Sequence, residues 1–248
     1  MNSEHKITCL NCGNPASGEF CSHCGQATNT SRYTLPHVFK KDFLKWVLYY
    51  NKGLFYTLKQ LFSRPGHSIR EYVEGKRVNH LGYISLLLVA IVLFTLTEKL
   101  TGFSYSKFST GIESQEILSA FDKVVNNYAK VLFLAEIVFY SASSYFLFKK
   151  AKQNYAEHLV LNSYKISAIL FINILFIFIE YLPHSVSAMI KINKFLVWIT
   201  WIYGTWFYYQ YFSVYYKNKF LLLLRSLLTT IIPTILFIVG IIYLLMIF

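Results

Sequence analysis

Residues 81–97 read LGYISLLLVAIVLFTLT and contain no charged side chain. A helix of about 20 such residues spans the hydrocarbon core of a bilayer. The composition of the whole chain also indicates a membrane protein, because 55% of its 248 residues are hydrophobic and 19% are aromatic. These residues gather in long runs, which is the pattern of integral membrane proteins.

Further apolar runs follow along the chain, and the sequence predicts an all-α integral membrane fold with five spanning helices. Two of the runs are less regular: Glu136 interrupts one, and another is short unless it continues as far as Pro183. Four spans are the alternative if the third run is re-entrant. The five expected spans are residues 81–97, 131–148, 166–179, 195–216 and 226–248.

Lysine and arginine predict the orientation, because they concentrate in cytoplasmic loops. Eleven lie in residues 1–81, four in 149–165 and three in 217–225, against four in 98–130 and two in 180–194. Five spans with a cytoplasmic amino terminus therefore place 18 lysines and arginines on the cytoplasmic side of the membrane and 6 on the outer side. We expect a multi-pass protein of the cell inner (cytoplasmic) membrane with its carboxyl terminus at the outer face. The first span acts as an uncleaved anchor.

The amino-terminal end carries four cysteines, which form two Cys-x-x-Cys pairs: Cys9 with Cys12, and Cys21 with Cys24. Two such pairs can offer four thiolates to one tetrahedral metal ion, most often zinc. We therefore expect a zinc-ribbon-like head with its linker in residues 1–31, followed by a juxtamembrane region in 32–80 and a transmembrane domain in 81–248.

Three alternatives to zinc follow from the same cysteines. Two disulfides belong to oxidising compartments, whereas the predicted topology places this segment in the cytoplasm. A redox pair needs a strand and a helix around one Cys-x-x-Cys. Iron also binds thiolates, and spacing alone does not distinguish it from zinc. His23 lies inside the second pair and is expected to be exposed.

Residues 38–62 predict a basic amphipathic helix between the head and the first span. Large apolar residues recur there every three or four positions, with lysines mostly on the opposite side. Such a helix is suited to the interface of an anionic inner leaflet, and the alternative is a helix packed on the bundle. The expected headgroup contacts, including a cluster just before the first span, are Lys41, Lys45, Lys52, Lys59, Arg70, Lys76 and Arg77.

These motifs together resemble an uncharacterised bacterial family, domain of unknown function 3667. The resemblance covers about residues 7–90 and rests on CLNCG at residues 9–13, FCSHCGQ at 20–26, RPG at 64–66 and IREY at 69–72 with GKR at 75–77. It implies a zinc-ribbon-headed integral membrane protein and no activity. The expected topology is also similar to that of Yip-like membrane proteins, which is an analogy of topology alone.

The strongest polar anomaly is Glu136, inside the second expected span. A carboxylate at that depth costs on the order of 3 kcal/mol unless it is protonated, paired or hydrated. Glu136 is therefore a candidate for an intramembrane polar site, together with Asn173 and Gln210. The structural alternative is a buried hydrogen bond to a neighbouring helix, or a side chain that reaches to the outer face.

The expected function is that of a non-enzymatic membrane adaptor or scaffold subunit, which binds a protein partner in a membrane complex. The sequence contains no Gly-x-Ser-x-Gly, His-Glu-x-x-His or phosphate-binding glycine motif, and it identifies no small-molecule substrate. Nucleic acid is not an expected partner, because the head lacks a basic footprint. The alternative is a small transporter or channel whose polar path includes Glu136.

Overall fold

A computed structural model describes residues 7–39, 53–102, 115–182 and 186–247. A small two-stranded ribbon precedes a mostly helical body. The elements are β1 (Ile7–Thr8), β2 (Pro15–Ala16), α1 (Leu35–Phe39), α3 (Leu54–Ser63), α4 (Pro65–Val73), α5 (Tyr83–Thr101), α6 (Gln115–Leu147), the 3-10 turn η2 (Lys149–Ala151), α7 (Tyr155–Tyr181), α8 (Val186–Phe212) and α9 (Lys219–Ile247).

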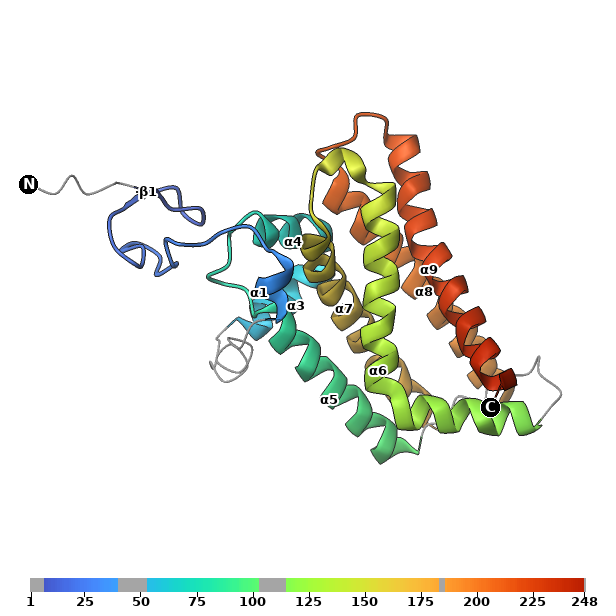
Figure 1. Ribbon diagram of the computed structural model, residues 1–248. Coiled ribbons are helices and arrows are strands. Elements are labelled where there is room, and N and C mark those ends of the chain that lie inside the picture. Colours follow the sequence, from blue (N-terminus) through green and yellow to red (C-terminus); the bar gives the residue numbers. More distant parts are fainter. Residues whose placement is uncertain (1–6, 40–52, 103–114, 183–185, 248) are drawn as a thin grey trace, which may run out of the picture.

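The five long helices, α5 to α9, form the body of the protein. Successive helices run alternately away from and back towards the end that carries α4 and the ribbon, which we call the ribbon end (Figure 1). Contacts at this end tie the turns together: Tyr215, after α8, donates a hydrogen bond to Glu74, after α4, at 3.1 Å. The last helix, α9, ends at the opposite end of the body (Figure 1).

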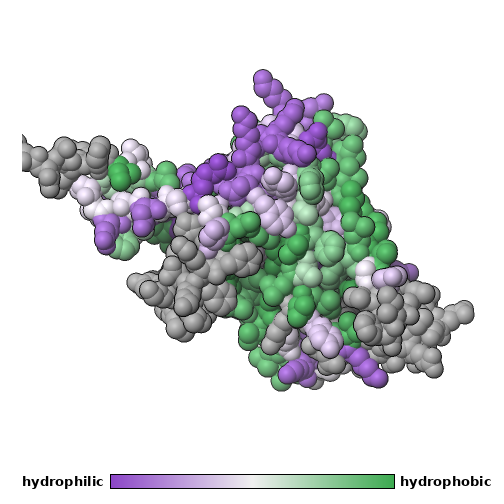
Figure 2. Space-filling model, viewed as in Figure 1, coloured by the Kyte–Doolittle hydropathy of each residue, from purple (hydrophilic) through white to green (hydrophobic). Residues whose placement is uncertain are grey.

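Three of the described helices are long and apolar enough to cross a membrane. They are Tyr83–Thr101 of α5, Tyr155–Glu180 of α7 and Lys219–Ile241 of α9. On the face drawn in Figure 2, apolar side chains cover the body between a polar ribbon end and smaller polar patches at the other end. This distribution associates the chain with a membrane.

The structure does not confirm five spans. The apolar part of α6, Val131–Leu147, is shorter than a membrane-crossing helix. Helix α8 has 27 residues, but its polar and amphipathic residues, among them Trp198, Trp201 and Trp206, lower its mean hydropathy. These two helices contain most of the second and fourth expected spans.

The third expected span is part of a longer helix. Helix α7 begins at Tyr155 because the Asn154 side chain accepts a hydrogen bond from the Glu157 N–H at 3.0 Å and Glu157 bonds back to the Asn154 N–H at 2.9 Å. It then continues without a break to Tyr181. Lys165 was expected in a cytoplasmic loop, and this expectation is wrong: it is fully buried within α7. The inside count of basic residues falls from 18 to 17.

The juxtamembrane region packs on the bundle at the ribbon end. In α3, Leu54, Leu58 and Leu61 face the hydrophobic core, whereas Phe55 is 83% exposed. In α4, a Cβ atom added to Gly66 would lie 2.3 Å from a backbone atom of α8, so the two helices meet backbone to backbone. The predicted amphipathic helix lies partly outside the described residues, which omit 40–52.

Candidate metal centre and its junction with the helical bundle

Two backbone turns of the same design hold the four cysteines. In the first turn, the Cys9 N–H donates to Asn14 O at 2.9 Å and the Gly13 N–H donates to Cys9 O at 2.9 Å. In the second, the corresponding bonds run from Cys21 to Gln26 O and from Gly25 to Cys21 O, both at 2.8 Å. The glycines have φ angles of +76° and +74°, which L-residues with side chains rarely adopt.

The turns bring the four sulfur atoms into one cluster, as the sequence predicted. All four lie within 4.8 Å of one another, and the pairs Cys9–Cys24 and Cys12–Cys21 are each 3.6 Å apart. Metal–sulfur bonds of about 2.3 Å at tetrahedral angles place sulfurs about 3.8 Å apart. The four cysteines are free thiols, because their sulfur–sulfur distances are far longer than the disulfide bond length of about 2.05 Å. The donor set therefore fits a metal ion.

Backbone amides favour the thiolate form at one cysteine of each pair, Cys9 and Cys21, whereas the pKa of Cys24 is raised to about 11 by burial and by the neighbouring cysteine thiols. The N–H groups of Cys12 and Asn11 lower the pKa of Cys9 to about 7, because a hydrogen bond to the charged form favours it. The amides of Cys24 and His23 lower the pKa of Cys21 in the same way. The His23 side chain is exposed and is not part of the cluster.

The residue after the second turn joins the ribbon to the bundle. Gln26, which is 4% exposed, donates from Nε2 to Gly75 O at 2.7 Å and accepts the Arg77 N–H at Oε1 at 3.0 Å. Gly75 also lies against Leu10 of the first turn, since an added Cβ would be 2.7 Å from Leu10 Cδ1. The loop before α5 thus contacts both halves of the metal-binding ribbon.

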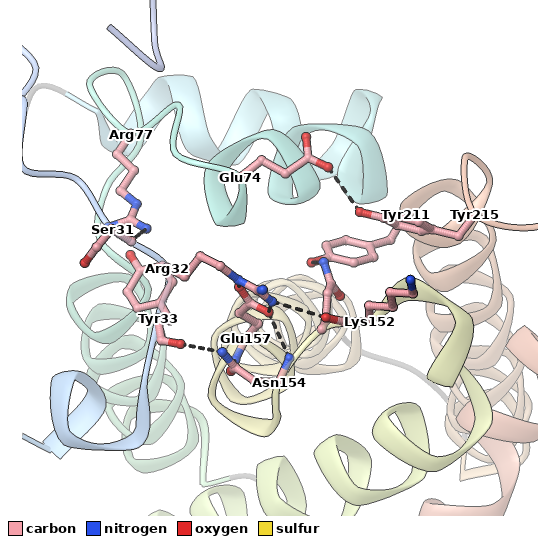
Figure 3. Close-up of polar contacts among 11 residues, drawn as sticks. Ser31, Arg32, Tyr33, Glu74, Arg77, Lys152, Asn154, Glu157, Tyr211 and Tyr215 are labelled. Atoms are coloured by element: carbon pink, nitrogen blue, oxygen red, sulfur yellow. Dashed lines mark hydrogen bonds and ion pairs between the residues drawn. The ribbon is translucent and has the colours of Figure 1, made fainter. Parts of the chain in front are cut away.

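A second junction fixes the segment after the ribbon to the start of α7 (Figure 3). Arg32 forms a two-pronged contact with Glu157, at 2.8 Å from Nε and 2.6 Å from Nη2. Asn154 donates to Tyr33 O at 2.8 Å. Arg77 stacks over the Tyr33 ring at 4.0 Å and donates to Ser31 O at 2.8 Å. Specific contacts therefore hold both the last residue of the expected head-and-linker segment, Ser31, and the first residues of the juxtamembrane region, Arg32 and Tyr33.

The two junctions border a cleft at the ribbon end. Its volume is about 620 Å³. Residues of the ribbon, the segment after it, α4 and the start of α7 face it, and Glu74 and Tyr215 close one side with their hydrogen bond (Figure 3). Charged side chains among the residues that line the cleft include Arg32, Lys152, Glu74 and Glu157.

The basic residues predicted to contact lipid headgroups lie in different surroundings. Lys59 and Lys76 are exposed, as a headgroup contact requires. Arg70 is half-buried and donates to Tyr211 O at 3.3 Å, at the end of α8, and Arg77 belongs to the ribbon junction. The remaining three, Lys41, Lys45 and Lys52, lie outside the described residues.

The three residues predicted to share an intramembrane polar site lie on three different helices. Gln210 lies near the ribbon end of α8 and accepts the Gly66 N–H at 3.2 Å. Asn173 is half-buried in α7. Glu136 of α6 has its charge interaction with Lys165 of α7. Sequence reasoning missed Lys165, although the Asn154-x-x-Glu157 capping box was a signal that the helix begins before it.

The comparisons with known proteins concern the juxtamembrane region and the first span. Residues 51–95 match the family described as Protein of unknown function (DUF3667), in agreement with the resemblance carried by the sequence motifs. No curated protein and no solved structure matches the chain.

Proposed function

We propose, from the contacts of the chain, that it is a non-enzymatic membrane adaptor. The family that residues 51–95 match is described without a function. The ribbon binds one zinc ion and presents a protein-binding surface at the cytoplasmic face of the inner membrane. Five helices, including α6 and α8, span the bilayer with the carboxyl terminus outside.

One observation carries this proposal: the ribbon is held on the bundle while its own apolar side chains stay exposed. Gln26 and Leu10 fix it to the loop at Gly75. Away from this junction, Phe20 is 63% exposed and Ile7 is 50% exposed. A rigidly presented apolar side chain loses little conformational entropy when a partner covers it, and aromatic residues are enriched in the centres of protein interfaces.

The chemistry of the metal site supports binding rather than catalysis. Four thiolates fill the coordination shell of zinc and leave no position for a substrate, which is the arrangement of structural sites. Among the described residues, the four cysteines are the only cluster of His, Cys, Asp or Glu able to hold a metal ion.

Site-specific photocrosslinking in cells tests the adaptor function. A photoreactive phenylalanine analogue replaces Phe20, and the matched control carries it at Phe55, which is 83% exposed on α3. We expect one protein companion to be joined through position 20 and not through position 55. The adduct should disappear in Cys9→Ser, because loss of a ligand unfolds the ribbon.

Two outcomes would overturn the proposal. One is that position 20 crosslinks only lipid or nothing. The other is that the companion is captured equally by Cys9→Ser, which would show that the folded ribbon is not the binding surface.

A further inference from the structure

The most unusual side chain in the body of the protein is Lys165. It lies ten residues after the start of α7, which is about 15 Å along the helix axis, and α7 is one of the helices able to cross a membrane. Its side chain is fully buried, and its Nζ atom has no hydrogen-bond partner. A charged residue within a spanning helix is rare, and most such residues serve function.

Three other helices surround the amine. Its Nζ lies 2.7 Å from the centre of the Tyr140 ring of α6 and 5.7 Å from that of Tyr208 of α8. Gly204 of α8 packs beside the lysine stem: an added Cβ would lie 3.6 Å from Lys165 Cε, an ordinary contact distance, and 3.0 Å from Thr230 Cγ2 of α9. The site is therefore built from the packing of α6, α7, α8 and α9.

The aromatic rings alone do not balance a buried ammonium group. A desolvated cation–π contact is weaker than the cost of removing an ammonium ion from water, even after relaxation of the surroundings. A negative charge is needed nearby. Glu136 lies one helical turn before Tyr140 on α6, and its charge interacts with that of Lys165.

Among the described residues, few other titratable groups face this pair. Tyr140 faces it from α6 and Tyr208 from α8. The groups that α9 contributes nearby are the hydroxyls of Thr230 and Thr234, the latter 2.7 Å from the Tyr140 hydroxyl. Glu136 is therefore the carboxylate available to compensate Lys165.

Polar side chains lead from this site towards the ribbon end. The Tyr208 hydroxyl donates to Asn162 Oδ1 at 2.5 Å, and Asn162 Nδ2 donates to Ser144 Oγ at 3.1 Å. Ser144 Oγ lies 2.8 Å from Nδ1 of His158, which is the residue after Glu157 of the ribbon-end cleft. The interior next to Lys165 is thus polar on one side, although every member of this route is buried.

We propose that Lys165 and Glu136 form one intramembrane proton-binding site. At neutral pH the site holds one exchangeable proton, on the ammonium group, and the carboxylate balances its charge. On acidification the Glu136 carboxylate takes a second proton from solvent, an O–H bond forms, and the site gains one positive charge. That charge is uncompensated, so proton uptake loosens the packing of α6 on α7. This inference does not depend on the adaptor function.

The first test is a double-mutant cycle on the detergent-purified full chain. Glu136→Gln leaves the lysine without its counter-charge, and Lys165→Met leaves the carboxylate without one, so each should lower the melting temperature. The double variant removes both charges and should melt higher than Glu136→Gln alone, because only unpaired buried charge is costly. Additive losses in the double variant would overturn the pairing.

The second test reads the proton directly by infrared difference spectroscopy of the protein in lipid vesicles. Acidification should produce the carbonyl band of a protonated carboxylic acid, and this band should be missing from the same difference in Glu136→Gln. In Lys165→Met the band should already be present at neutral pH, because the counter-charge is lost. The matched control is Glu74→Gln, an exposed carboxyl at the ribbon end, which should retain the Glu136 band. An acid-induced band unchanged by Glu136→Gln would refute the site.

Discussion

Gly66 shows how closely the juxtamembrane helix α4 approaches the bundle. An added Cβ atom would lie 2.3 Å from both Phe207 O and Tyr211 N of α8. Both are backbone atoms within a helix and cannot move aside without shifting the helix itself. The absence of a side chain at position 66 is therefore a packing requirement of this joint.

We therefore expect Gly66→Ala to lower the free energy of unfolding by about 1–3 kcal/mol or more, since overpacking typically costs that much. The measurement is thermal unfolding in detergent. Gly240→Ala is the matched control, because a Cβ there meets nothing within 4 Å and alanine favours a helix. Equal melting temperatures for the two variants would contradict the close approach.

His80 makes the stability of the juxtamembrane region depend on pH. Burial lowers the pKa of His80 to about 4, and its Nε2 lies 2.8 Å from Ser68 Oγ. As pH falls from 6.5 towards 4, the unfolded chain binds a proton that the folded chain does not. The free energy of unfolding should therefore fall by up to about 3 kcal/mol across this window.

The measurement for His80 is the melting temperature between pH 7.5 and pH 4.5, approximately, in wild type and in His80→Gln. The variant removes this titration, so its melting temperature should fall less steeply with acidification. The prediction fails if the two slopes are the same, whatever the absolute stability of the variant.

At the scale of the element, the start of α7 combines a helix cap with the anchor of the preceding segment. Glu157 accepts from the Asn154 N–H as part of the capping box and also binds Arg32. The Arg32 side chain is 64% exposed whereas that of Glu157 is 4% exposed, so water screens the pair from the arginine side. Its effect is local, on the segment that leads out of the ribbon.

Two substitutions of Glu157 separate these roles. Glu157→Gln keeps a capping-box residue but removes the charge, so hydrogen exchange should rise at residues 31–33 and not in the first turn of α7. Glu157→Ala should raise exchange in both. The contacts would be unimportant if neither substitution changed exchange at residues 31–33.

The sequence pattern predicted the apolar face of a helix better than it predicted what that face packs against. The stripe that includes Leu54, Leu58 and Leu61 was expected to face lipid, with bundle packing as the alternative. In the described part, α3, these leucines pack on the core, because the same periodicity serves either surface. The cysteine cluster was predictable because ligand type and spacing decide it locally.

Lys165 could not be placed from hydropathy, because a lysine at the edge of an apolar run is indistinguishable from a loop residue. Its surroundings include Tyr140 of α6 and Gly204 of α8, which come from other helices and reach it only in the folded bundle. The partner of Glu136 was missed for the same reason. Only the Asn154–Glu157 cap, a local signal, indicated the true start of α7.

At the scale of the whole molecule, the described residues form two separate apolar clusters. The hydrophobic cluster of the ribbon consists of the buried residues Cys9, Ala16 and Cys21, with Cys12 and Cys24 packed beside them. The helical body has its own large core. A core of this size does not stabilise a fold without metal, whereas the body does not depend on the metal site for its core.

Metal removal should therefore unfold the ribbon and leave the body folded. A strong chelator should make residues 7–30 sensitive to protease while the melting temperature of the helical body changes little. Cys9→Ser without chelator should give the same cleavage pattern. A ribbon that stays protected without metal, or a body that unfolds with it, would contradict the separation of the two cores.

The tryptophans of α8 give that helix an optical signature. Three of the four tryptophans of the chain lie in it, and Trp198, 60% exposed, meets Trp201 edge-on at 5.8 Å. In a Trp46→Phe background, all tryptophan emission comes from this one helix. Lipids brominated along their acyl chains quench indole by contact, so strong quenching would report that α8 touches hydrocarbon. Tryptophan fluorescence, without any added label, thus reports whether α8 contacts lipid, which its hydropathy alone does not decide.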